Sequence, residues 1–170
     1  MRVDTSGTLL VGKTVSNDTT EGTRIVSGGL LSVVRDGNVS LILNRNTSDG
    51  ATAFFRRSGT TVGSISVTGT TTTYNTSSDY RLKEIDGPIT KSGDYIDALK
   101  PVQGSWKADG SRFIGLLAHE VQEVSETTIA TGEKDGEEMQ SMDYSSSEII
   151  ANLIAEVQSL LSRLAKLEGN

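Results

Sequence analysis

Hydrophobic positions change their spacing along the chain, and the change divides it into two parts. In residues 1–77, short runs of alternating apolar and polar residues are separated by Gly-containing pairs, which is the pattern of strands joined by tight turns. We expect strands at Arg2–Asp4, Leu9–Val11, Leu31–Arg35, Val39–Leu43, Ala53–Arg57 and Val62–Val67. The expected turns are Ser6-Gly7, Gly28-Gly29, Asp36-Gly37, Asp49-Gly50 and Ser58-Gly59.

Helical spacing replaces this alternation in residues 78–170. Tyr95–Lys100 predicts a short helix that Pro101 ends, because proline cannot continue a helix. Arg112–Val124 predicts a second helix, since its apolar residues recur at spacings of 3, 4 and 3. Residues 125–143 are polar, and the glycines at 132 and 136 indicate an exposed hairpin or loop.

The clearest element is a helix predicted over residues 145–168. Its apolar residues recur at alternating spacings of 3 and 4, which is the seam of a coiled coil. They are Ile150, Leu153, Val157, Leu160, Leu164 and Leu167. Such a helix can pack on its own domain or against other copies of the chain, and we favour the second. The residue types in the seam, Ile and Val at one position with Leu at the other, favour a coiled coil of two helices. A trimer must therefore be argued from other evidence.

Composition makes a self-sufficient first half difficult. Hydrophobic residues are 35% of the chain and aromatic residues 5%, and those in residues 1–77 are mostly isolated. Burial of so little apolar surface would hardly offset the backbone entropy lost on folding, which costs about 1–2 kcal/mol per residue. We therefore expect a β core shared between chains, with an isolated small β domain as the alternative. The net charge also changes, from +2 in residues 1–77 to -8 in residues 78–170.

Several classes of protein are excluded at this stage. The absence of Cys excludes disulfides and thiolate chemistry, and the single His excludes a metal site built from clustered histidines. No run approaches the roughly 20 apolar residues that cross a bilayer, so membrane insertion is not expected. The acidic balance, a net charge of -6, argues against nucleic acid as a partner.

Three motifs in order carry a resemblance to a known family. Ser78–Glu84 reads Ser-Asp-Tyr-Arg-Leu-Lys-Glu, a Leu-Lys-Pro-Val segment ends at Val102, and Gly115–Val124 contains Ala-His-Glu-Val-Gln-Glu-Val. Together they resemble the C-terminal intramolecular chaperone and self-cleaving peptidase of phage tail spikes and tail fibres (peptidase S74), best known from endosialidases. The preceding Ile42–Val67 resembles the β-stem of tail fibres.

The resemblance implies a β + α fold and a specific role. Residues 1–77 would end an intertwined trimeric β-stem, a triple β-helix. Residues 78–170 would be a mainly α chaperone domain that ends in a trimeric helical bundle. This domain would hold a homotrimer together while the upstream fibre segments of the same chain fold, and would then release itself by one cut.

The same resemblance places the protein in the phage virion. The chain would fold in the host cytoplasm, need no cofactor, and lose its chaperone part after cleavage. The mature fibre would bind a host surface glycan or receptor. The rival expectation is a structural or receptor-binding fibre tip that never cuts itself.

Carried over by motif, the catalytic pair is Ser78 and Lys83. A serine hydroxyl needs a base to remove its proton, and Lys can serve if its pKa falls well below about 10.4. Burial or a nearby cation lowers the pKa of a Lys, so Arg81 could help and Asp79 would oppose it. Burial of Lys83 in the trimer would then switch the cut on.

The bond that breaks is left open within the junction Ser77-Ser78-Asp79. Attack of Ser78 on the carbonyl of Ser77 passes through a five-membered ring and gives an ester, so ring strain favours the Ser77–Ser78 bond. Ser78 could instead act on another chain, or activate water to hydrolyse the Ser78–Asp79 bond.

His119 and Glu120 begin a zinc-protease-like pattern, His-Glu-Val-Gln, but Glu123 stands where the second His should be. One His with flanking carboxylates is a poor zinc site, so no metal is expected. The family pattern Ala-x-Glu-Val includes Glu120, and a structural or trigger role is expected for this pair rather than direct catalysis.

Overall fold

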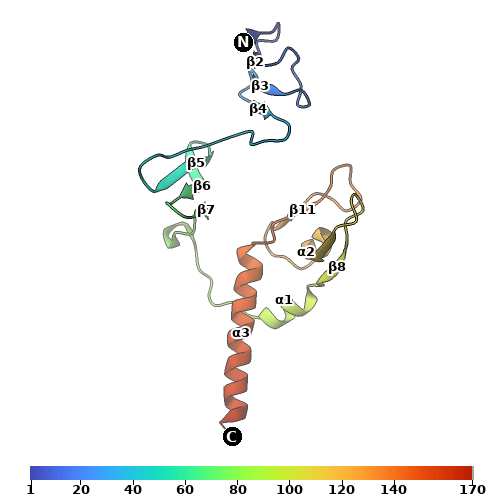
Figure 1. Cartoon of the computed structure of the whole chain (residues 1–170). Helices are drawn as coiled ribbons and strands as arrows, with labels where there is room; N and C mark the ends of the chain where they lie inside the picture. The colour runs from blue at the N-terminus through green and yellow to red at the C-terminus, as the bar shows by residue number, and fades with distance from the viewer. Residues whose placement is uncertain (170) are drawn as a thin grey trace. The chain divides into compact units, whose positions relative to one another are not determined.

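The computed structural model describes residues 1–169, and the chain divides into two compact units, Met1–Glu84 and Ile85–Asn170 (Figure 1). The last residue of the predicted domain 78–170, Asn170, lies outside the described residues. Ser78 and Lys83 belong to the first unit. No helix in the described part of the chain is both long and apolar enough to cross a bilayer.

The first unit begins with a four-stranded antiparallel sheet in the order β1-β2-β3-β4. The strands are β1 (Arg2–Val3), β2 (Leu9–Val11), β3 (Gly22–Ile25) and β4 (Leu31–Val34). Leu10 on β2 is its buried centre, with 1% of its surface exposed. Gly22 has a φ of +121°, and a Cβ there would lie 2.7 Å from the carbonyl oxygen of Val11, so only glycine fits.

The loop between β2 and β3 is organised around a buried amine. Lys13 is buried, and its Nζ donates hydrogen bonds to the carbonyl oxygens of Asn17 (2.8 Å) and Thr20 (2.7 Å). Arg24 on β3 forms an ion pair with Asp18 of the same loop at 2.7 Å. Polar contacts of this kind hold a loop that has almost no apolar residues to bury.

A three-stranded antiparallel sheet follows, in the order β5-β6-β7. Its strands are β5 (Gly50–Arg57), β6 (Thr60–Val67) and β7 (Thr72–Thr76). Ser58 and Gly59 join β5 to β6 with φ values of 48° and 82°. Two consecutive positive φ values are typical of a type I′ hairpin turn, so the predicted turn at this pair is confirmed.

The second unit combines hairpins with helices. Its elements are α1 (Ser92–Ala98), β8 (Val102–Ser105), β9 (Arg112–Gly115), α2 (Ala118–Gln122), β10 (Ala130–Thr131), β11 (Ser141–Met142) and α3 (Ser147–Glu168). The pairs β8-β9 and β10-β11 are antiparallel. The helix α1 packs against α3, and Ser92 Oγ donates a hydrogen bond to Glu156 Oε2 at 3.0 Å.

The predicted triple β-helix stem is wrong. The strands of the first unit pair as two antiparallel meanders within one chain, each strand with its neighbour in sequence. Short connections explain most of this pairing, because they return the chain directly beside the strand that it has just left. The longer connection is the loop of residues 12–21 between β2 and β3, where Lys13 binds backbone carbonyls. Val39–Leu43, predicted as a strand, forms none. Two strands, β3 and β7, were not predicted, because they lack an apolar alternation.

The predicted mainly α second domain is also wrong, because four strands lie between its helices. The predicted helix over Arg112–Val124 is in fact β9, a short loop and α2. In β9, Phe113 packs its ring against Trp106, with centroids 5.4 Å apart, while Ile114 points outward and is 84% exposed. The apolar residues with the helical spacing of 3 and 4 therefore belong to different elements, β9 and α2. The final helix is confirmed as α3.

A carboxylate fixes the start of α3 to the loop before β10. Glu148, in the first turn of α3, accepts hydrogen bonds from the backbone N–H groups of Glu126 (3.0 Å) and Thr127 (2.9 Å) and from Ser125 Oγ (3.1 Å). The Thr127 hydroxyl also donates to this carboxylate. Burial opposes the ionisation of Glu148, but the hydrogen bonds, above all that of the Thr127 hydroxyl, outweigh burial and lower its pKa. Burial, assisted by the nearby Glu148 carboxylate, raises the pKa of Tyr95 to about 12.

We expect Glu148→Gln to destabilise the second unit by about 1–3 kcal/mol at pH 7, because bonds to a charged acceptor are lost or weakened. The folded pKa lies below the ordinary value of 4.5. The stabilisation is therefore complete above pH 4.5 and disappears as the pH falls through the folded pKa. Urea unfolding, followed by the single Trp106, should show wild type and variant converging in acid.

The matched control for this prediction is Glu137→Gln, which changes an exposed carboxylate of the same unit. It should leave the free energy of unfolding within about 0.5 kcal/mol of wild type. A Glu148→Gln deficit that stays constant from pH 7 to pH 3 would show that the charge of Glu148 is not its source.

Candidate functional site

The segment after β7 turns back on itself within five residues. The chain leaves β7 at Thr76 and enters η1, a single 3-10 turn at Tyr80–Leu82. Asp79 is its N-cap, and its side chain accepts a hydrogen bond from the backbone N–H of Arg81 at 2.9 Å. Backbone bonds from Leu82 N–H to the Asp79 carbonyl and from Lys83 N–H to the Tyr80 carbonyl, both 3.1 Å, close the turn.

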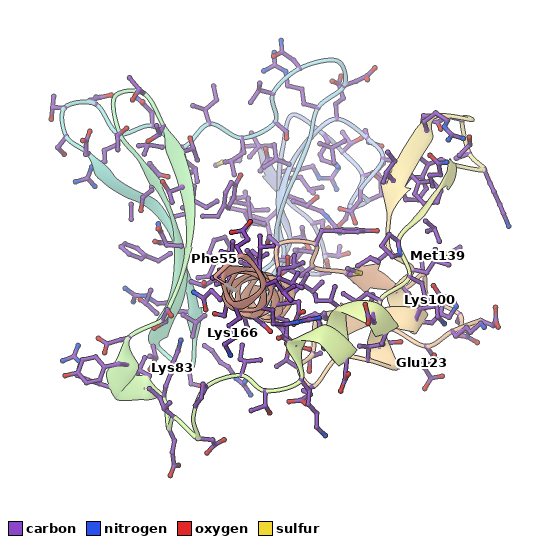
Figure 2. All side chains as sticks on the ribbon, turned by 90° about the horizontal axis from the view of Figure 1, so that it is seen from below. Phe55, Lys83, Lys100, Glu123, Met139 and Lys166 are labelled. Atoms are coloured by element: carbon purple, nitrogen blue, oxygen red, sulfur yellow. The ribbon has the colours of Figure 1, made fainter. Side chains whose placement is uncertain are left out.

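This turn brings Ser78 and Lys83 together. Lys83 Nζ donates a hydrogen bond to Ser78 Oγ at 2.7 Å. Lys83 is labelled in Figure 2. Both residues are exposed. An amine at this distance can take the hydroxyl proton when it is neutral, which is the geometry that a Ser–Lys nucleophile requires.

Arg81 is directed at Asp79. Its Nε donates to both carboxylate oxygens of Asp79, at 3.0 and 3.1 Å, and Nη2 completes an ion pair. The hydrogen bond from the Arg81 side chain is the main reason why the pKa of Asp79 lies below its usual range. The same contact raises the pKa of Arg81. The Arg81 guanidinium is thus paired with the Asp79 carboxylate and is not an isolated cation.

His119 and Glu120 lie in the second unit, on α2. Glu120 Oε1 is 3.6 Å from Lys100 Nζ, while its other carboxylate oxygen is buried without a hydrogen-bond partner. Figure 2 labels Lys100 and also Glu123, which is the C-cap of α2. Across residues 1–169, no group of three or more His, Asp or Glu side chains is placed to hold a metal ion.

Two features of the site were missed in the sequence. Asp79 was expected only to oppose the activation of Lys83, yet it caps the turn that carries Lys83. A signal was available, because Asp is one of the preferred N-cap residues. The ion pair between Lys100 and Glu120 was also missed, because it joins residues 20 positions apart.

Comparison with protein families matched one segment of the chain. Residues 78–129 fit the family described as chaperone of endosialidase, whose name, Peptidase_S74, denotes a peptidase. The matched segment starts at Ser78 and includes Lys83, His119 and Glu120, and it confirms the resemblance carried by the three motifs. No curated protein and no solved structure matched the chain.

Proposed function

Residues 78–129 belong to the chaperone-of-endosialidase family, and from this premise we propose that the chain forms the C-terminal end of a phage tail fibre or tail spike. Residues 78–170 act as an intramolecular chaperone for the upstream segment of the same chain, and then release themselves by one self-inflicted cut. The observation that carries the proposal is the 2.7 Å hydrogen bond between Lys83 Nζ and Ser78 Oγ at the first residue of the family segment.

The proposed cut proceeds by an acyl shift. The neutral amine of Lys83 takes the proton of the Ser78 hydroxyl, and Oγ adds to the carbonyl carbon of Ser77. The bond from that carbon to the Ser78 nitrogen then breaks, and the nitrogen takes the proton back from Lys83. Water hydrolyses the resulting ester, which leaves a carboxylate on Ser77 and a free amino group on Ser78.

Assembly provides the switch in this proposal. An amine in water is mostly an ammonium at neutral pH, and it must be neutral before it can accept a proton. Ser78 and Lys83 are exposed in the single chain. Contact with neighbouring copies would remove water from the pair and favour the neutral amine, because desolvation disfavours the charged form. The cut would then follow assembly, with folding in the host cytoplasm and the mature fibre in the virion.

Three copies of the chain form the assembly in this proposal, a number taken from the family resemblance. The single chain exposes 13681 Å². Two separate compact proteins of half its mass would together expose only about 9,700 Å². Part of the difference is an apolar stripe on α3, whose side chains are 45–77% exposed. The stripe comprises Ile150, Leu153, Ile154, Val157, Leu160, Leu161, Leu164 and Leu167.

The width of this stripe supports contact with more than one neighbour. Ile154 and Leu161 each follow a seam residue directly, so they widen the narrow seam of a two-stranded coiled coil. The helix α1 packs against α3 through Ser92 and Glu156, so the stripe stays exposed in the single chain.

We expect wild-type chain to yield the fragments 1–77 and 78–170 on a denaturing gel. Ser78→Ala and Lys83→Ala should slow the cut by roughly 10³-fold or more, because each removes a member of the reacting pair. Lys83→Arg should be equally slow, since arginine does not give up its proton in proteins. Ser77→Ala is the matched control and should still cut, because only the carbonyl of residue 77 reacts.

Wild-type chain that assembles and stays full-length would contradict self-cleavage and favour a purely structural or receptor-binding fibre tip. Cutting that persists in Ser78→Ala but stops in Ser77→Ala would reassign the nucleophile.

The ester intermediate makes a second outcome measurable. Hydroxylamine attacks esters much faster than amides, so its addition during the cut should give fragment 1–77 with a C-terminal hydroxamate, detectable by mass spectrometry. Ser78→Ala should give no hydroxamate. A fragment that ends at Ser78 with an ordinary carboxylate would instead show hydrolysis of the Ser78–Asp79 bond by activated water.

We expect Leu160→Glu on α3 to weaken assembly strongly, since each copy loses about 1.5–3 kcal/mol of apolar burial and gains a charge at the contact. Sedimentation of the uncut Ser78→Ala chain should show trimer for the parent and mainly monomer for the variant at micromolar concentration. Lys166→Glu on α3 (Figure 2) changes a polar residue outside the stripe and should leave the trimer intact. Equal effects of both substitutions would exclude the stripe as the contact.

A further inference from the structure

We propose that Asp79 and Arg81 are positioning residues for the cut: their clamp holds the turn that presents Lys83 to Ser78. This inference rests on the proposed function, because it assigns a role within the same reaction. Neither side chain touches the reacting atoms in this assignment; both act through the backbone between Ser78 and Lys83.

The first step is geometric. Five residues of extended chain would place the Cα atoms of Ser78 and Lys83 about 17 Å apart, beyond the reach of a Lys side chain. The backbone is extended at Asp79 (φ -67°, ψ 130°) and again at Lys83 (φ -126°, ψ 137°). Reversal of the chain therefore depends on η1 alone, and the 2.7 Å contact exists only while this turn is formed.

The second step concerns what holds the turn. No residue of η1 is buried, and Tyr80 and Leu82 are 76% and 74% exposed, so apolar packing within the chain does not stabilise it. A single 3-10 turn with two backbone bonds is marginal in water. The remaining contacts are those of Asp79, which caps the Arg81 N–H and binds the Arg81 guanidinium.

The third step concerns charge. An unpaired carboxylate at position 79 would attract the ammonium form of Lys83 and so oppose the neutral base. The guanidinium of Arg81 forms an ion pair with this carboxylate. One pair of side chains thus shapes the turn and also neutralises the charge of the Asp79 carboxylate.

The test compares Asp79→Ala with Asp79→Asn. We expect Asp79→Ala to slow the cut roughly 3- to 30-fold, because the cap is lost. Asparagine also caps, so Asp79→Asn should stay within about 3-fold of wild type. Arg81→Ala keeps the cap to the residue 81 N–H but leaves the Asp79 carboxylate unpaired, so it should slow the cut more than Asp79→Asn does. The control Asp86→Ala changes an exposed carboxylate a few residues away and should leave the rate unchanged.

A second measurement follows the turn without the cut. In the uncut Ser78→Ala chain, hydrogen exchange at the amides of residues 81–83 should speed up with Asp79→Ala and return towards the parent rate with Asp79→Asn. Sedimentation should show the same assembly for all variants.

The two measurements separate the inference from the proposed function. Wild-type chain that cuts, with Asp79→Ala cutting equally fast, overturns the positioning role alone. Asp79→Asn as slow as Asp79→Ala overturns the capping argument. Wild-type chain that never cuts overturns the proposed function. In that case, hydrogen exchange at residues 81–83 that is identical in all variants also overturns the role of Asp79 in holding the turn.

Discussion

A shortage of internal apolar burial governs this chain. Among the described residues, the buried hydrophobic side chains are Leu10, Val121, Ile129 and Ala130. Such a core cannot by itself offset the entropy of ordering the chain. Polar contacts therefore hold its local structures: those of Lys13 hold the loop between β2 and β3, and those of Glu148 hold the start of α3. Many large apolar residues stay exposed in the single chain, and in the proposed assembly they would be buried between copies.

The candidate site is also held by polar contacts and not by apolar burial. Ser78 and Lys83 meet through one short turn that has no buried residue. Asp79 caps this turn and forms an ion pair with Arg81. A site built this way is assembled locally, yet it remains solvated in the single chain. The local geometry of the pair is thus supplied by the turn, whereas the proposed exclusion of water would have to come from assembly.

Structure that depends on neighbouring residues could be predicted from the sequence, and structure that depends on distant residues could not. The α3 helix and the Ser58-Gly59 turn were predicted because a single period or a single residue pair determines them. The Arg112–Val124 helix failed because the outward-facing Ile114 completed a false period. For the site, the pairing of Ser78 with Lys83 came from the family resemblance. The Asp79 cap was not predicted, because a hydrogen bond between a side chain and the backbone produces no periodic pattern of apolar residues in the sequence.

The gap between the last strand of the first unit and η1 has a consequence for the proposed cut. β7 ends at Thr76 and the cap of η1 is Asp79, so Ser77 and Ser78 belong to neither element. Scission of their peptide bond would leave every ladder of the β5-β6-β7 sheet and both hydrogen bonds of η1 intact. Neither fragment would need to unfold or refold. Fragment 78–170 would keep both Ser78 and Lys83, so the proposed reaction could not cut fragment 1–77 a second time.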